Sequence, residues 1–149
     1  MGLDSALALI ESVKDYRVLF IGDKIIDEYH YVESLGKSPK EHLIPMRYVS
    51  EEVFHGGVEA AANHARSFCA SVTVAGGNKI TRKVRMVDKT YMRKLAEVHY
   101  EEECATTDGF VGALEAIVVT DFGHGAIDDV LAKRYANTKS FAAVNAQTN

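Results

Sequence analysis

Four unbroken runs of mainly apolar residues are spaced along the chain, and each ends at a glycine or a polar residue. An unbroken apolar run, unlike an alternating one, is typical of a strand that is buried on both faces of a parallel sheet. The pattern therefore predicts four buried strands, at Arg17–Ile21, Ser71–Ala75, Ala116–Thr120 and Phe141–Val144.

Segments with helical spacing lie before and between these strands. Apolar residues recur at helical spacing over Leu3–Val13, and the alanine-rich segment from Val58 to about Cys69 favours a helix. A third helix is predicted over Asp128–Ala136, and a loop with a short helix over Thr107–Leu114. Buried strands that alternate with helices indicate an α/β fold, in which helices flank a parallel sheet.

The polar stretch over residues 25–54 interrupts this alternation. It holds both prolines of the chain and contains short β-like pieces at Glu28–Val32 and Ile44–Val53. Farther along, charged and apolar residues alternate over Lys83–Val87 and Arg93–Tyr100, which predicts a half-exposed antiparallel pair. These pieces together predict a small β flap that is separate from the main sheet.

Length and composition place the chain among globular proteins. It has 149 residues, 47% hydrophobic and 26% charged, which excludes a disordered or low-complexity chain. We therefore expect a single domain over residues 1–149, with the flap at approximately 28–54 and 81–100. The formal net charge of −4 argues against non-specific nucleic-acid binding, which depends on basic patches.

Several common sites and signals are missing from the sequence. No apolar run is long enough to span a membrane, and no secretory signal pattern is present. Cys69 and Cys104 are far apart and outside any CxxC, so we expect reduced thiols in a cytoplasmic protein. P-loop, GxGxxG, HExxH and GxSxG motifs are absent, and the histidines show no metal-ligand spacing.

Polar and glycine-rich segments follow the predicted strands, where ligands of parallel sheets bind. Asp23 and Asp27 come after the first strand; their carboxylates can accept hydrogen bonds from sugar hydroxyls, or they can simply occupy a turn. Gly56 and Gly57 open the alanine-rich helix, where backbone N–H groups are free. Asn63 lies in this helix, where its amide can either meet hydroxyls or face solvent.

A third segment, Asp121-Phe122-Gly123-His124-Gly125, follows the third strand. Glycines at a strand end beside a helix start can form an anion-binding nest, with Asp121, Gly123 and Gly125 as its framework. The same residues also suit a tight connection between a strand and a helix. The sequence pattern is compatible both with a phosphate-binding loop and with a purely structural loop.

Taken together and in this order, these segments resemble the ribokinase-like (PfkB-type) carbohydrate kinases, in particular the heptose-phosphate kinase half of ADP-heptose synthase. Four segments carry the resemblance. They are Arg17–Tyr29 with its GDxxxDxY text, Gly56–Asn63 with its glycine pair and Asn, the ribbon piece Lys83–Asp88, and Asp121–Gly125, which is similar to DYGKG with Phe122 for Tyr and His124 for Lys.

The resemblance implies ATP-dependent transfer of phosphate to a sugar hydroxyl, with ATP and Mg²⁺ as cofactors. It implies that Asp27, Gly56, Gly57 and Asn63 hold the sugar, with Asp23 beside them. Lys83 and Arg85 are implied as partners for a sugar phosphate. The flap is expected to cover the sugar and to form a homodimer contact.

The chain also departs from this family. The GAGD text, which in the family opens the anion-binding helix and supplies the catalytic base, is absent, and the segment between Ala75 and Thr81 is short. The chain thus looks truncated and internally deleted, so we assign no catalytic residue and expect no tight binding of ATP or Mg²⁺. Three interpretations stay open: part of a longer sugar kinase, a non-catalytic sugar-phosphate-binding or protein-interaction relative, or an unrelated α/β domain.

Overall fold

The computed structural model describes residues 2–104, 112–136 and 138–147, and its strands form two separate sheets. Sheet A is parallel throughout, in the order β4-β1-β7-β8. Its strands are β1 (Arg17–Gly22), β4 (Ser71–Ala75), β7 (Ala116–Asp121) and β8 (Phe141–Ala146). The predicted α/β fold with a parallel sheet is therefore confirmed.

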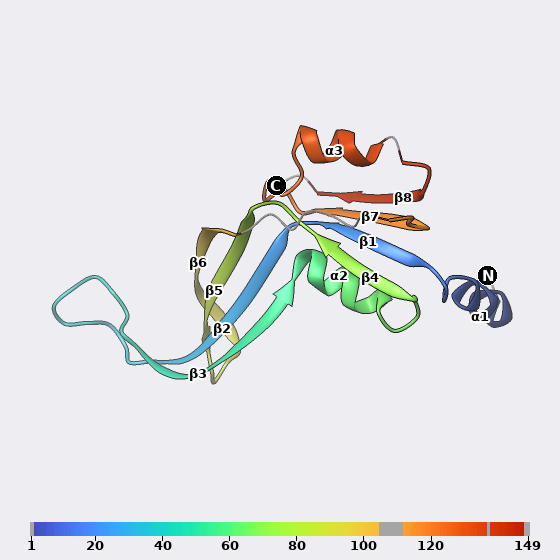
Figure 1. The fold of residues 1–149 in the computed structure, drawn as a ribbon. Helices are drawn as coiled ribbons and strands as arrows, with labels where there is room; N and C mark the ends of the chain where they lie inside the picture. Colours follow the sequence, from blue (N-terminus) through green and yellow to red (C-terminus); the bar gives the residue numbers. More distant parts are fainter. Residues whose placement is uncertain (1, 105–111, 137, 148–149) are drawn as a thin grey trace.

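Sheet A is packed between two helices, α2 (Gly57–Ala65) and α3 (Asp129–Ala136), which lie on its opposite sides (Figure 1). Successive side chains of β1 alternate between these two sides, as in any strand. Val18 and Phe20 pack with Val58, Ala62 and Ala65 of α2, whereas Leu19 and Ile21 lie in the cluster that Leu131 and Tyr135 of α3 cover. The unbroken apolar run in β1 thus contributes side chains to two hydrophobic clusters, one on each side of sheet A.

Sheet B has the strand order β3-β2-β5-β6 and projects from the carboxyl ends of the sheet A strands (Figure 1). Its strands are β2 (Lys24–Ser34), β3 (Met46–Gly56), β5 (Lys79–Asp88) and β6 (Arg93–Glu103). The two hairpin pairs β2–β3 and β5–β6 are antiparallel, while β2 and β5 run parallel to each other. Sheet B is the predicted flap, but it is larger than the expected bounds, because β2 continues β1 after a single residue.

Other predicted bounds also need correction. The helix expected to reach about Cys69 ends at Ala65, because Phe68 and Cys69 both donate their N–H to the Ala65 carbonyl and close a turn. The short helix predicted within 107–114 lies mostly outside the described residues, and residues 112–114 are not helical.

The prediction that Phe141–Val144 is a buried strand is wrong. In β8 the side chains of Phe141 and Val144 are 70% and 69% exposed, since no described strand pairs with the outer edge of β8. At the other edge of sheet A, β4 is only partly buried, for the same reason. Apolar runs thus give strand identity correctly but cannot show whether the strand has two neighbours.

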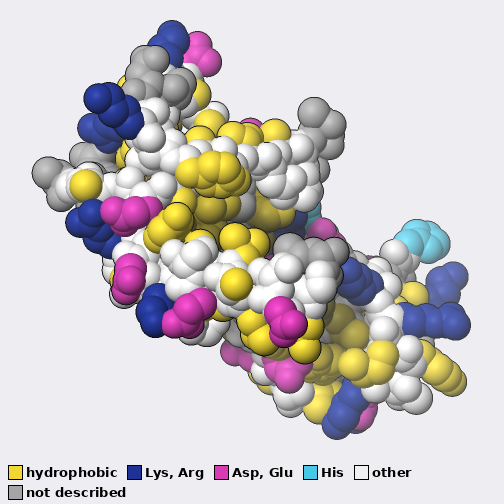
Figure 2. Space-filling view, turned by 90° about the vertical axis from the view of Figure 1, so that its right-hand side faces the viewer, with side chains coloured by type: hydrophobic (Ala, Val, Ile, Leu, Met, Phe, Trp, Pro, Cys, Tyr) yellow, Lys and Arg dark blue, Asp and Glu magenta, His cyan; other side chains and the backbone are white. Residues whose placement is uncertain are grey.

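Hydrophobic side chains also remain at the surface elsewhere (Figure 2). The helix α1 (Leu3–Ser12) forms as its spacing predicts, but none of its residues is buried, and Leu3 is 75% exposed. Figure 1 shows this helix at the far end of sheet A from sheet B. None of the helices that the structure describes has the length and hydrophobicity needed to cross a lipid bilayer.

Candidate functional site

The predicted site residues gather where sheet A, sheet B and the start of α2 meet. Asp23 is the single residue between β1 and β2, and its backbone joins three elements. Its N–H donates to the carbonyl of Thr120 on β7 (3.3 Å), and its own carbonyl accepts from the N–H of Val58 on α2 (2.9 Å). The junction is therefore held by main-chain hydrogen bonds.

The side chain of Asp23 binds the loop that follows β7. It is 2% exposed, and its carboxylate accepts three backbone N–H groups. Oδ2 accepts from Phe122 (2.6 Å) and His124 (3.4 Å), and Oδ1 accepts from Ala126 (3.0 Å). Hydrogen bonds to an ionised acceptor are stronger than neutral ones, so this carboxylate fixes the loop.

The hydrogen bonds of Asp23 bear on whether residues 121–125 form an anion-binding nest or a structural loop, which the sequence left undecided. The loop does form a concave set of N–H donors, with Gly123 and Gly125 at positive φ angles of 77° and 80°. The Asp121 carboxylate accepts the N–H of Gly123 (2.9 Å) and tightens the turn. The anion in this nest is Asp23 of the same chain, which favours a structural role for Asp121, Gly123 and Gly125.

Asp27 belongs to a chain of ionic contacts across the flap. Arg85 donates from Nη1 to Asp27 Oδ1 and from Nε to Glu97 Oε2 (2.5 Å). His99 continues the chain, with its Nε2 2.5 Å from Glu97 Oε1. The guanidinium also lies over the ring of Tyr29, 5.2 Å from its centroid. These contacts join β2, β5 and β6 on one face of sheet B.

The charges of this network shift the pKa values of its members. The pKa of Glu97 is lowered, chiefly by its hydrogen bond with His99, and the hydrogen bond and charge of Arg85 lower it further against an opposing effect of burial. Burial lowers the pKa of Arg85, but Asp27 and Glu97 outweigh it, so the net shift is upward. Arg85 therefore stays charged, and its guanidinium holds the Asp27 carboxylate in place.

Gly56 and Gly57 place the start of α2 against the two aspartates. A Cβ atom on Gly56 would lie 2.7 Å from Asp27 Oδ2, so the carboxylate rests on the bare glycine backbone. Gly57 has a φ of 58°, and a Cβ there would collide with the backbone carbonyl of Asp23. Gly57 therefore requires glycine, whereas a side chain at Gly56 would push the Asp27 carboxylate away.

The other two predicted binding residues lie on neighbouring elements. Lys83 is the register partner of Asp27 on β5 and of His99 on β6, so the three side chains share one face of the flap. Asn63 lies on the exposed side of α2, and its amide oxygen accepts a hydrogen bond from Arg66. The structure therefore brings Asp27, Lys83, Arg85 and Gly56 together, and assigns Asp23 to the loop.

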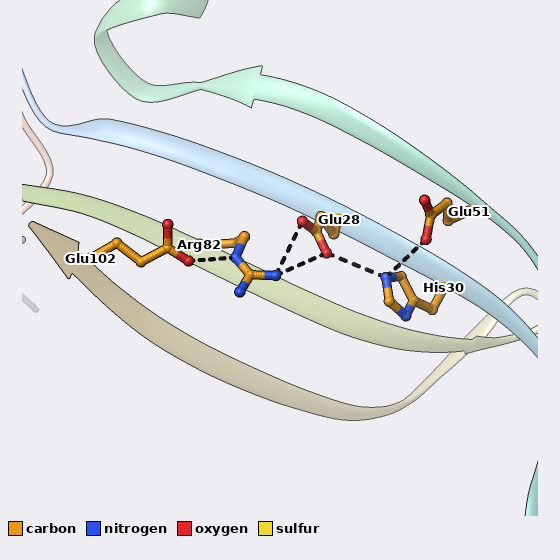
Figure 3. Close-up of polar contacts among 5 residues, drawn as sticks. All are labelled: Glu28, His30, Glu51, Arg82 and Glu102. Carbon is orange, nitrogen blue, oxygen red and sulfur yellow. Dashed lines mark hydrogen bonds and ion pairs between the residues drawn. The ribbon is translucent and has the colours of Figure 1, made fainter. Parts of the chain in front are cut away.

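A second polar network (Figure 3) lies on the opposite face of sheet B, since Glu28 and Arg82 are direct neighbours in sequence of Asp27 and Lys83. Arg82 donates to Glu102 (Nε to Oε1, 2.8 Å) and to Glu28 (3.3 Å to Oε1), and it stacks 4.5 Å from the ring centroid of Tyr100. His30 Nε2 lies 3.3 Å from Glu28 Oε2 and 3.4 Å from Glu51 Oε2. This network ties β3, β2, β5 and β6 together from outside the candidate site.

Sequence reasoning missed Glu97, His99 and the network of Figure 3. The available signal was the polar residue at every second position of Glu97–Glu103, which predicts a polar strand face without naming its partners. In the described part of the chain, no group of three or more His, Cys, Asp or Glu side chains is arranged to hold a metal ion.

Comparison with known proteins gives only distant similarity. No protein-family model matches the chain, and no curated protein sequence matches it. Among solved structures, the nucleoside kinase of Methanocaldococcus jannaschii, an archaeal member of the ribokinase family, is 9% identical with a TM-score of 0.37, over 72% of this chain and 45% of that chain.

Two further solved structures show similarity of the same order. A candidate sugar kinase from Clostridium perfringens is 11% identical with a TM-score of 0.44, over 91% of this chain and 52% of that chain. A candidate ribokinase from Agrobacterium tumefaciens is 15% identical with a TM-score of 0.33, over 70% of this chain and 44% of that chain. The chain spans about half the length of these proteins.

Proposed function

We propose that this chain is the sugar-binding part of a ribokinase-like carbohydrate kinase, and that it binds a sugar or sugar phosphate without transferring phosphate by itself. The observation that carries the proposal is the contact between Asp27 and the glycine pair. A partly exposed carboxylate, braced by Arg85, rests on the bare backbone of Gly56 at the start of α2. This is the place where ligands of parallel sheets bind.

The chemistry of these groups suits a polyol. The Asp27 carboxylate accepts hydrogen bonds from hydroxyl groups, and its attachment to Arg85 fixes its direction before the ligand arrives. A glycine without a side chain lets the ligand approach the backbone closely. Asn63, which the resemblance implies as a further sugar ligand, lies on the exposed side of α2 and accepts a hydrogen bond from Arg66, so it is not part of this group.

A phosphate group on the sugar would be recognised by Lys83 rather than by Arg85. Arg85 already donates to two carboxylates, Asp27 and Glu97, and is largely buried. Lys83 lies beside Asp27 on the same face, with His99 as its neighbour on β6. Specificity for a heptose phosphate, which the resemblance implies, is part of this proposal, as is a cytoplasmic location.

The loop that follows β7 does not fit the phosphates of the ATP that the resemblance implies. Nucleotide phosphates bind to free backbone N–H groups, but those of Phe122, His124 and Ala126 already donate to Asp23. The described residues also offer no cluster of metal ligands. We therefore derive no phosphoryl-transfer step, and the proposal concerns sugar binding alone.

Calorimetric titration with heptose and hexose phosphates and with the neutral sugars, each with and without ATP–Mg²⁺, tests the proposal. We expect binding that is indifferent to ATP and at least tenfold weaker in Asp27→Asn. The matched control Glu33→Gln, an exposed carboxylate of the same flap strand, should bind like the wild type. Absence of sugar binding, or binding unchanged in Asp27→Asn, overturns the sugar site, and a phosphorylated product detected by mass spectrometry overturns the non-catalytic role.

An alternative function as a protein-interaction module is favoured by a separate observation. On the face of the flap that carries the network of Figure 3, the outer strands β3 and β6 expose the large hydrophobic side chains of Tyr48, Val53, Val98 and Tyr100. Tyrosine is enriched in protein interfaces. The homodimer contact through the flap that the resemblance implies would use this surface, and it stays a prediction.

A further inference from the structure

A hollow lies on the face of sheet B that carries the network of Figure 3, at the end of the flap that meets α2 and β4. It is a cavity of about 290 Å³. Strands β2, β3, β4 and β5 and the first turn of α2 form its wall, with the residues Lys24, Ile26, His55, Glu59, Val74 and Ile80. Because strands and a helix form the wall, the hollow is already shaped before any ligand binds.

This hollow is separate from the proposed sugar site. Ile26 and Asp27 are neighbours on β2, so their side chains lie on opposite faces of sheet B. The register of β2 with β5 puts Lys24 and Ile80 on the face of Arg82, which is not the face of Asp27. A ligand in the hollow therefore lies behind the strand that carries Asp27.

Lys24 brings a positive charge to the hollow. It is partly buried, and its stem lies along Gly76 after β4, where a Cβ atom would come within 2.9 Å of Lys24 Cε. The ammonium group lies 3.9 Å from Cys104 Sγ, and sulfur is only a weak acceptor. None of the ion pairs between described residues involves Lys24. Because lysines seldom leave water without a partner charge, this ammonium group favours an anionic ligand.

The other polar side chains of the wall are compatible with an anion. His55 carries an N–H donor in its neutral form as well as in its charged form. Glu59 is the one carboxylate among the described residues of the wall, and its Oε2 is paired with Arg66 Nη2 at 3.3 Å. The charge of Glu59 is therefore already balanced from outside the hollow.

The rest of the wall is aliphatic and selects for the body of the ligand. Ile26, Val74 and Ile80 present branched side chains, which favour an aliphatic group. One water molecule takes up about 30 Å³ of the liquid, so a volume of about 290 Å³ holds about nine or ten atoms of that size. A carboxylate with a short branched chain fits this space and both kinds of wall.

We propose that this hollow binds a small aliphatic monocarboxylate. The Lys24 ammonium group exchanges its weak contact with the Cys104 thiol for a charge-assisted hydrogen bond to the carboxylate, and His55 donates a second hydrogen bond. The aliphatic chain lies against the isoleucines of β2 and β5 and the valine of β4. Binding here requires no sugar, so this proposal stands or falls apart from the proposed function.

Titration of the wild-type chain with isovalerate, followed by amide NMR, tests the proposal without any sugar present. We expect saturable shifts centred on Lys24, Ile26 and Ile80. Isovaleramide has the same shape without the charge, and acetate keeps the charge with only a methyl group. Each should bind at least tenfold more weakly than isovalerate, because each lacks one of the two matched features.

Three variants assign the binding to this wall. Lys24→Met keeps a stem along Gly76 but removes the charge, so isovalerate should bind at least tenfold more weakly. Ile26→Phe fills the hollow from a partly exposed strand position and should abolish binding. The matched control Lys79→Met removes a lysine next to Ile80 that is 49% exposed on the other face of β5, and it should bind isovalerate like the wild type.

Circular dichroism and urea unfolding show whether each variant keeps the fold, and the comparison of isovalerate with isovaleramide on the wild type does not depend on any variant. Absence of saturable shifts with isovalerate would overturn the proposal. Equal binding of isovaleramide, or full binding of isovalerate by a folded Lys24→Met, would overturn it as well.

Discussion

Replacement of Asp23 by alanine would remove the acceptor that organises the junction of the two sheets. The carboxylate is buried and receives the N–H groups of Phe122, His124 and Ala126. In Asp23→Ala these donors lose their acceptor without leaving the fold. Asp23→Ala should therefore lower the free energy of unfolding, whatever the chain binds.

The magnitude depends on how many of the three donors can reach water. Ala126 is 4% exposed, so its N–H stays unsatisfied, at a cost of about 1–3 kcal/mol. Phe122 and His124 are partly exposed and regain hydration, so they add less, although the bond to Phe122 is short at 2.6 Å. We expect a total loss of about 3 kcal/mol, which a domain with a stability of about 5–15 kcal/mol survives.

Two isosteric variants sharpen this prediction. Asp23→Asn keeps the size of the side chain but turns one acceptor into an NH₂ group that faces an N–H, so we expect roughly half the loss. Asp121→Asn changes a neighbouring carboxylate whose one bond to the loop is at an exposed N–H, so it should cost under about 1 kcal/mol.

Urea unfolding of the three variants, followed by circular dichroism, gives each free energy of unfolding. Equal slopes against urea concentration would show that the transition remains comparable across the series. If Asp23→Ala came within about 0.5 kcal/mol of the wild type, or cost no more than Asp121→Asn, the role of Asp23 in the loop would be refuted.

Three further predictions follow from the junction, the network and the strand ends. Gly56→Ala should displace only the end of a side chain and leave the urea midpoint nearly unchanged while weakening sugar binding by calorimetry, whereas Gly57→Ala should lower the midpoint markedly because its Cβ meets backbone. Arg85→Met should cost about 2 kcal/mol in urea unfolding at pH 7, because the carboxylates of Asp27 and Glu97 lose the guanidinium that both bind. Since Arg85 helps to lower the pKa of Glu97, this cost should shrink as the pH falls below the ordinary pKa of a glutamate. The pKa of Glu115 is lowered from 4.5 to about 2, chiefly by its side-chain hydrogen bond with Arg17. Glu115 should therefore stabilise the fold fully above about pH 4.5 and lose this effect as the pH falls through 2. The free energy of unfolding of Glu115→Gln should depend less on pH in that window, and a dependence equal to that of the wild type would contradict the assignment.

The different surroundings of Asp23 and Asp27 could not be predicted from the sequence. Both follow the first predicted strand, and both were expected to lie beside a sugar. The residue spacing could not show that sheet A ends at Gly22 and sheet B begins at Lys24. This break places Asp23 under the loop that follows β7 and Asp27 on the open flap. The Asp23 carboxylate is therefore fully hydrogen-bonded within the fold, whereas the Asp27 carboxylate is left partly exposed.

The sequence by itself determined the local elements of this protein. Apolar runs and helical spacing are properties of neighbouring residues, and they identified all four strands of sheet A, the flap and the helices α1, α2 and α3. The glycine pair that opens α2 was also visible, because glycine marks positions that a side chain would block.

Only the tertiary structure decided which groups meet. The pairing of Asp27 with Arg85, 58 positions away, and the filling of the loop nest by Asp23, 99 positions before Phe122, depend on strand order. The exposure of β8 likewise depends on whether a neighbour lies beyond it, and not on its own residues. Burial and pairing arise between segments distant along the chain, so a pattern read along one segment cannot contain them.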